Sequence, residues 1–166
     1  MSLFAHQAVV VRREEAETLG LGGNTAHLLA DSSSTAGALS TLRISLARGA
    51  DGAVPHYHAG SSELFFVLDG RLQVLAGEEV VTANAGDLLV VPPTMPHAFA
   101  APARSGADLL IVITPGVERF EYFRLLERIG RGEATTEELM AGQERYDTHM
   151  LDAPLWREAR ATRREA

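Results

Sequence analysis

The sequence predicts an all-β fold, an antiparallel sandwich or barrel of short strands, with helices added after it. Between residues 54 and 114, short runs of Val, Leu, Ile and Phe recur at regular spacing and are separated by Gly, Pro, Asn and Asp. Within the stretch 38–47, apolar residues occupy alternate positions, which is the period of a half-buried strand. After Pro115-Gly116 the apolar residues recur about every three positions instead, which is the period of a helix.

The expected strands follow one another with turn residues between them. We expect strands over the segments 8–12, 25–30, 38–47, 64–68, 71–75, 80–82, 88–91, 97–100 and 109–114. Asp69-Gly70 separates two of these strands and is a strong signal for a hairpin turn, because Gly tolerates positive φ. The polar segment 31–35 predicts a loop, and Asn84-Ala85-Gly86-Asp87 predicts another turn.

The last fifty residues predict two amphipathic helices. The first carries an apolar stripe and ends at the glycines of Gly130-Arg131-Gly132; the stripe consists of Val117, Phe120, Phe123, Leu126 and Ile129. Thr135 and Glu138 form a capping box that opens a second helix, which should run to about Tyr146. Because both helices need an apolar partner surface, we expect 117–166 to be an extension of one domain whose barrel spans 1–116. The tail from Arg157 is expected to fray.

Length, charge and composition exclude several classes of protein. The chain of 166 residues and 17.8 kDa fits one domain, and its net charge of -7 argues against a nucleic-acid partner. Cysteine is absent, so neither a disulfide framework nor a catalytic thiol is available. The N-terminal residues lack a secretory signal, and the strongest apolar run, Leu109–Ile113, is too short to cross a bilayer. We therefore expect a cytoplasmic protein without a membrane partner.

Four residues with metal-binding side chains stand at spacings that the strands of a barrel would bring together: His56, His58, Glu63 and His97. On a strand His56 and His58 share one face, with backbones roughly 6–7 Å apart. The short connection 59–62 lets the chain reverse and bring Glu63 beside them, and His97 opens a later strand. Three imidazoles and one carboxylate suit a divalent transition metal (Fe, Ni, Mn, Cu or Zn), with open positions for water or substrate.

The same residues resemble the two sequence motifs of the cupin superfamily. The stretch 56–70 resembles the first motif, His-x-His, then Glu, then Gly six residues later, and 86–97 resembles the second, Gly, Pro, then His. The chain departs from the motifs at Ala50, Thr94 and Ala101, which are loop and strand-end positions that affect turns more than ligation. The resemblance implies a double-stranded β-helix, the cupin jelly-roll barrel, with the metal inside one end and these four residues as its ligands.

Strand parity predicts the walls of this site. Phe65 and Val67 share the face of Glu63, Val54 shares that of the first two histidines, and Phe99 shares that of His97. These side chains should line an apolar substrate pocket around the ion. Glu63 has two possible roles, a fourth metal ligand or, when detached, a catalytic general base, and the sequence leaves both open.

The C-terminal pattern, a Thr-Pro-Gly followed by an aromatic-rich helix, resembles single-domain cupins of the quercetin 2,3-dioxygenase type. That resemblance implies an enzyme in which the substrate hydroxyl binds the metal, the Glu takes its proton and dioxygen cleaves the ring. We therefore expect a metal-dependent dioxygenase acting on a small aromatic or enolic substrate. Two alternatives stay open: a zinc cupin that cyclises or isomerises a polyketide-like or keto substrate without oxygen, and a binding cupin without turnover. The family also implies a homodimer, with the strand 8–12 as the pairing element.

Overall fold

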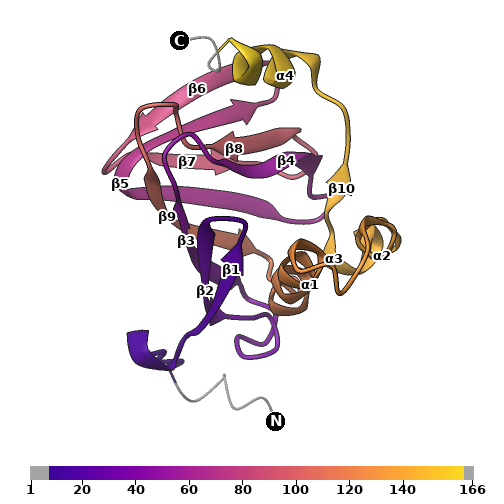
Figure 1. Cartoon of the computed structure of the whole chain (residues 1–166). Helices are drawn as coiled ribbons and strands as arrows, with labels where there is room; N and C mark the ends of the chain where they lie inside the picture. Colours follow the sequence, from indigo (N-terminus) through magenta and orange to yellow (C-terminus); the bar gives the residue numbers. More distant parts are fainter. Residues whose placement is uncertain (1–7, 163–166) are drawn as a thin grey trace.

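Residues 8–162, which the computed structural model describes, form two facing antiparallel sheets that share one long strand (Figure 1). The first sheet contains, in order, β1 (Glu17–Leu21), β2 (Asn24–Ala30), β3 (Ser40–Leu46), β9 (Ala107–Thr114), the first half of β5 (Ser62–Ala76) and β7 (Leu88–Val91). The second contains β6 (Glu79–Asn84), the rest of β5, β8 (His97–Ala100), β4 (Asp51–Tyr57) and β10 (His149–Met150). The expected jelly-roll barrel is thereby confirmed.

The core lies between the sheets because alternate residues of each strand face inward. β3 and β9 pair along their whole length and alternate buried with half-buried side chains, as the period of the sequence predicts. Their inward residues are aliphatic and almost fully buried: Leu42, Ile44, Leu46, Leu109, Ile111 and Ile113. Burial of each such side chain contributes about 1.5–3 kcal/mol to the stability of the fold. These two strands therefore stabilise the barrel strongly.

The hairpin predicted at Asp69-Gly70 is wrong, because β5 continues through both residues. β5 pairs with β9 before this point and with β8 after it, and the register against β9 shifts between Val67 and Asp69. Gly70 has φ 75°, and a Cβ there would lie 2.1 Å from the carbonyl oxygen of Gly106. The turn signal therefore marks a β-bulge, which bends the strand from one sheet into the other.

The N-terminal strand predicted over 8–12 is also wrong within this chain. The segment is extended but pairs with no strand among the described residues, and a short 3-10 helix, Arg13–Glu15, follows it. Two strands that the sequence did not indicate are present, β1 and the two-residue β10. Both pair with only one neighbour and are short, so neither carries a long apolar alternation that could be recognised.

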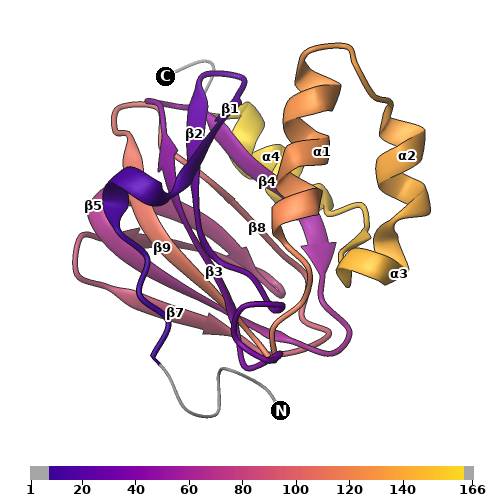
Figure 2. The same ribbon diagram turned by 90° about the horizontal axis from the view of Figure 1, so that it is seen from below.

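The C-terminal residues form four helices rather than two: α1 (Phe120–Gly130), α2 (Thr136–Ala141), α3 (Gln143–Tyr146) and α4 (Pro154–Ala161). The capping box of Thr135 and Glu138 is present. The second expected helix is interrupted at Gly142, where a Cβ would meet the Tyr146 ring at 2.7 Å. Figure 2 shows α1 next to the strands and α2 on its far side.

The tail does not fray at Arg157, because α4 continues to Ala161 and packs near β6. Arg160 holds it through hydrogen bonds to Asp51, Gln73 and two main-chain carbonyls, and Trp156 is buried. Arg163 and Arg164 lie outside the described residues. Within 8–162, none of the helices is both long enough and apolar enough to cross a membrane.

Candidate metal centre

The fold brings all four predicted metal-binding residues to one place inside the barrel. His56 lies in β4, His58 directly after it, Glu63 near the start of β5, and His97 at the start of β8. Each residue is at most 4% exposed, and one donor atom from each lies within 4.8 Å of the other three. The cluster can therefore hold a single ion away from bulk water.

The two sheets contribute different sides of this cluster. His56 and His97 are register partners on β4 and β8 of the second sheet, whereas Glu63 faces them from the first sheet, where β5 pairs with β7 and β9. The crossing of the chain between the end of β4 and the start of β5 thus places Glu63 opposite the imidazoles. As expected, the short connection after His58 brings Glu63 to the histidines. It does so by carrying the chain from one sheet to the facing one.

A main-chain carbonyl orients each imidazole. The Nδ1 of His56 donates to Val54 O at 2.7 Å, and that of His97 donates to Met95 O at 2.9 Å. The Nδ1 of His58 donates to the carbonyl of Asp147, which follows α3 in the C-terminal segment. Because a carbonyl only accepts, each Nδ1 carries the proton and each Nε2 presents a lone pair to the interior. This is the arrangement in which histidine binds metal ions.

The donor atoms also fit an ion by their spacing. The Nε2 atoms of His58 and His97 lie 3.0 and 2.7 Å from Oε2 of Glu63, and that of His56 lies 3.9 Å from it. Bonds of about 2.1 Å at right angles would place neighbouring donor atoms about 3 Å apart. A neutral imidazole whose proton is on Nδ1 has none left for the carboxylate, so a cation between these atoms satisfies lone pairs that otherwise face one another.

Electrostatics favour the protonation states that ligation needs at His56 and Glu63. Burial lowers the pKa of His56 to about 3, helped by the charge of His97, so its imidazole is neutral. Burial raises the pKa of Glu63, but the nearby imidazoles of His58 and His97 lower it further, so the pKa lies well below its usual range. Burial also lowers the pKa of His97, but the hydrogen bond and charge of Glu63 raise it further than burial lowers it. The site thus offers an ionised carboxylate to a cation.

Three of the four predicted wall residues lie inside the barrel, and one of them, Phe65, lies beside the cluster. Phe65, Val67 and Phe99 are buried, and the Phe65 ring lies 6.2 Å from the His97 ring and 5.3 Å from the Phe99 ring. The prediction for Val54 is wrong, because its side chain is 58% exposed. Between Ala53 and His56 the register of β4 against β8 shifts, so the parity counted back from His56 no longer holds. Val54 instead contributes its carbonyl to His56.

The C-terminal segment supplies residues near the cluster that the motifs did not indicate. Besides its carbonyl bond to His58, Asp147 accepts the main-chain N–H groups of Ala59 and Gly60 through its carboxylate. Arg119 and Tyr122 are buried beside one another, with the guanidinium 4.2 Å from the centre of the Tyr122 ring. One feature of the sequence could have indicated Arg119. It precedes Tyr122 and Phe123 by three and four residues, a spacing that puts an arginine on the same side of the helix as apolar residues of α1.

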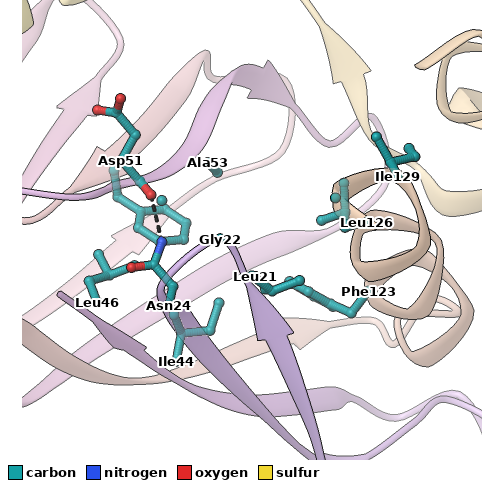
Figure 3. A pocket seen from close by; sticks show the side chains of 13 residues that line it. Leu21, Gly22, Asn24, Ile44, Leu46, Asp51, Ala53, Phe123, Leu126 and Ile129 are labelled. Carbon is teal, nitrogen blue, oxygen red and sulfur yellow. Dashed lines mark hydrogen bonds between the residues drawn. The ribbon is translucent and has the colours of Figure 1, made fainter. Parts of the chain in front are cut away.

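An apolar cavity of about 300 Å³ lies between α1 and the strands on this side of the barrel (Figure 3). Its lining includes Phe99 from β8, Phe123 and Leu126 from α1, and Ile44 from β3. At its rim the side-chain amide of Asn24 donates to the carbonyl of Asp51 at 2.8 Å. Since Phe99 packs on Phe65, which in turn packs on His97, the inner wall of the cavity is one aromatic layer away from the cluster.

Comparisons with known proteins agree with this architecture. Residues 42–113 match the family model of the cupin domain. An RmlC-like cupin from Shewanella frigidimarina has a TM-score of 0.58 at 23% identity and covers 70% of this chain and 96% of its own. The polyketide cyclase RemF from Streptomyces resistomycificus has a TM-score of 0.55 at 17% identity, over 66% and 80%. The nucleoside dehydratase Pac13 from Streptomyces has 0.52 at 19%, over 66% and 83%.

No curated protein matches the sequence. The solved structures are less than 25% identical to this chain, so they support its fold, and none of these neighbours singles out the quercetin dioxygenase type. The family model spans the strands that carry His56, His58, Glu63 and His97. With both motifs in place on a jelly-roll barrel, residues 42–113 of the chain form a cupin domain.

Proposed function

We propose that this cupin is a mononuclear metal-dependent enzyme that acts on a small aromatic or enolic substrate, in the first instance as a dioxygenase-type oxidoreductase. The observation that carries the proposal is the buried cluster of three Nε2 atoms and one carboxylate oxygen, each Nε2 directed inward by a main-chain carbonyl. His56, His58, His97 and Glu63 would hold the ion. When bound, it would act as a Lewis acid on an enol, phenol or carbonyl oxygen, and a redox-active ion would support dioxygen chemistry.

Glu63 is the residue that we expect to move a proton. Its close contacts with the Nε2 atoms of His58 and His97, at 3.0 and 2.7 Å, both involve Oε2, which leaves Oε1 to accept a proton from a substrate hydroxyl. Because the pKa of Glu63 lies well below its usual range, it is a weak base. Such a base takes a proton from an acidic hydroxyl, such as an enol or a phenol, far more readily than from an alcohol. This supports an enolic or phenolic substrate.

The surroundings of the cluster support a substrate with an apolar body. Phe65 and Phe99 form an aromatic layer beside His97, and the cavity behind that layer is lined mostly by apolar side chains. Pockets of this kind bind ligands through apolar contact and use a few polar groups for orientation. The exclusion of water by these side chains would also strengthen any charge interaction made at the cluster.

A second candidate is a non-oxidative reaction, cyclisation or isomerisation of a polyketide-like or keto substrate with zinc. It is favoured by the similarity in fold to a polyketide cyclase and to a nucleoside dehydratase, whose reactions, by name, are not oxidations. The same donor set serves both candidates, because three imidazoles and a carboxylate suit zinc as well as iron, nickel or manganese.

The experiment combines metal analysis with turnover in the presence and absence of oxygen. Protein purified without added metal is analysed for its elements, then loaded separately with Fe, Ni, Mn, Cu and Zn and offered a panel of flavonols and smaller enols. Oxygen uptake with a redox-active ion supports the dioxygenase, and turnover with zinc under nitrogen supports the second candidate. Binding without product under all conditions identifies a non-catalytic binding cupin and contradicts both.

The variant Glu63→Gln sharpens this test. Loss of a general base typically lowers kcat by a factor of about 10²–10⁴. Metal content must be measured alongside kcat, because Glu63 also stands among the metal-binding atoms. A variant that keeps its ion and its substrate affinity but loses kcat assigns the base role, whereas a variant that loses its ion assigns the ligand role.

We also propose that the protein is a homodimer. The extended segment 8–12 exposes three consecutive valines, of which Val10 is 61% exposed, and the edge strand β7 exposes Leu88 and Val90. Exposed apolar residues on an unpaired segment and on an edge strand are typical of surfaces that pair with another chain. Light scattering after size exclusion tests this, and a monomer at micromolar concentration would contradict it. The cytoplasmic location stays a prediction from the sequence.

A further inference from the structure

Arg119 is a buried cation with an unused hydrogen-bond donor. The residue is 4% exposed and directly precedes α1. One terminal nitrogen of its guanidinium donates to Thr148 Oγ1 at 2.7 Å and to the Tyr146 carbonyl at 3.3 Å. Its Nε has no hydrogen-bond partner, the one buried side-chain nitrogen or oxygen in that condition among residues 8–162. A buried N–H without a partner is destabilising, so this donor would be satisfied by an acceptor that residues 8–162 do not supply.

The charge of Arg119 is also uncompensated by the chain. Within the described residues, its guanidinium forms no ion pair with a carboxylate. Asp31 accepts the main-chain N–H groups of Arg119 and Phe120, so its carboxylate caps α1 and fixes the position of the arginine. The remaining partners of the guanidinium are two neutral oxygens and the rings of Tyr122 and Phe123. Burying a charge in this way is expensive unless an anion joins it.

The position of Arg119 connects it with the metal-binding cluster. Its partner Thr148 directly follows Asp147, whose carbonyl orients His58. Burial raises the pKa of Tyr122, Arg119 lowers it, and the charge of Glu63 raises it again. The guanidinium and the cluster thus share one buried electrostatic environment.

We propose that Arg119 binds an anionic oxygen of the substrate, a carboxylate or an enolate, while another oxygen of the same molecule faces the metal-binding cluster. This inference rests on the proposed function of that cluster as a substrate site. The substrate class is then a planar aromatic or enolic acid with two separated oxygen functions. Its anion would accept from Nε of Arg119 and neutralise the charge, and its ring would lie against the aromatic side chains that already surround the guanidinium, Tyr122 and Phe123.

The test compares two probes that differ in charge and hardly in shape, 3-hydroxybenzoate and 3-hydroxybenzamide. The meta arrangement prevents both oxygen functions from binding one ion. Titration calorimetry of the zinc-loaded protein should give about tenfold or tighter binding of the acid, the range for a charge-assisted hydrogen bond. In Arg119→Gln the two probes should bind within about twofold of each other. Equal affinities in the unmodified protein, or a preference that survives in Arg119→Gln, would overturn the proposal.

Two controls separate this effect from changes in the fold and in the ion. Arg145→Gln removes a neighbouring arginine that pairs with Glu118 at the surface and also lies over an aromatic ring, and it should leave the preference unchanged. The titrations are repeated on metal-free protein, because a preference that disappears with the ion would assign the carboxylate to the metal and contradict the role of Arg119. If Arg119→Gln fails to fold, Arg119→Lys is used instead, because it keeps the charge but lacks Nε. In this variant the tenfold preference for the acid should fall to about threefold or less. Full retention of the preference contradicts the proposal.

These outcomes are independent of whether the enzyme turns over any compound in the panel. A protein that prefers the acid through Arg119 but shows no turnover would leave this inference standing and contradict the proposed catalysis. A protein that turns over neutral enols without any preference for acids would contradict this inference and leave the proposed catalysis standing.

Discussion

Two parts of the molecule hold the same histidines by different means. The barrel strands place the four donor side chains, and their spacing in the sequence is a recognisable motif. The C-terminal segment, from Arg119 to Met150, reaches the cluster through the main-chain carbonyl of Asp147 and places the two-residue strand β10 beside β4. The comparison teaches that the spacing of residues along the strands encodes the possible metal site, whereas the hydrogen bond that orients His58 comes from an extension without a motif.

The largest expected effect comes from removing a donor on the barrel side. His97→Ala deletes an imidazole whose Nε2 lies 2.7 Å from Oε2 of Glu63 and leaves that carboxylate with His58 as its remaining close partner. We expect metal affinity to fall by more than the 10–100-fold that loss of an outer partner typically costs, so that dialysed protein retains almost no ion. Elemental analysis measures this, with the surface variant His27→Gln as control. One retained ion per chain would contradict the proposed ligand set.

The second prediction concerns the β-bulge that brings the barrel's two sheets together. Gly70→Ala places a Cβ 2.1 Å from the carbonyl oxygen of Gly106 and forces a non-glycine residue to φ 75°. We expect the free energy of unfolding to fall by about 3 kcal/mol, the sum of backbone strain and the steric clash. Gly86→Ala is the matched control, because its φ is 91° but no atom lies within 4 Å of the added Cβ, so about 1–2 kcal/mol is expected. Equal losses in urea denaturation would contradict the role given to Gly106.

The third prediction tests the C-terminal side of the comparison. Asp147→Ala removes the carboxylate that accepts the N–H groups of Ala59 and Gly60, which follow His58 in the chain, and it also strains a residue at φ 46°. We expect about a tenfold loss of metal affinity, because the carbonyl that orients His58 is no longer held in place. Chelator competition measures this loss. Asp147→Asn retains an acceptor and tolerates this backbone region, so it should lose less than threefold; an equal loss in both variants contradicts the explanation.

Much of this arrangement could be predicted from the sequence, because it depends on side-chain alternation and on fixed spacings. The strands β7 and β8 lie where the pattern predicts them, and His56, His58, Glu63 and His97 converge. The failures share one cause, irregular backbone. Asp69-Gly70 has the composition of a turn but forms a bulge, and a second register shift in β4 turns Val54 outward. A bulge changes the parity of every residue counted across it.

The C-terminal contacts could not be predicted for a different reason. Asp147 acts on His58 through its main-chain carbonyl, a group that every residue possesses, so no residue type marks the position. The two residues of β10 are too few to show a period, although they pair with β4. Of these residues, only Arg119 could be recognised in the sequence, because it is a charged residue at helical spacing from the apolar residues of α1. Interactions between distant segments, rather than local patterns, decide this half of the site.

The smallest expected effect lies on the outside of the barrel, away from both parts of the site. Arg43 on β3 donates to Asp108 on β9 through Nε at 2.9 Å, and this hydrogen bond lowers the pKa of Asp108 against the opposing effect of partial burial. A carboxyl whose pKa is lower in the folded state stabilises the protein above its unfolded pKa, near 4, and loses that contribution as pH falls further. Asp108→Asn should therefore cost less than about 1 kcal/mol at pH 7, since both side chains are partly solvent-exposed, and the difference from the unmodified protein should shrink between pH 5 and pH 3. Urea denaturation at several pH values measures this, and a difference that stays constant would show that Asp108 acts through packing.

Metal affinity should not change in this variant, because the pair lies on the solvent side of strands whose opposite faces form the core.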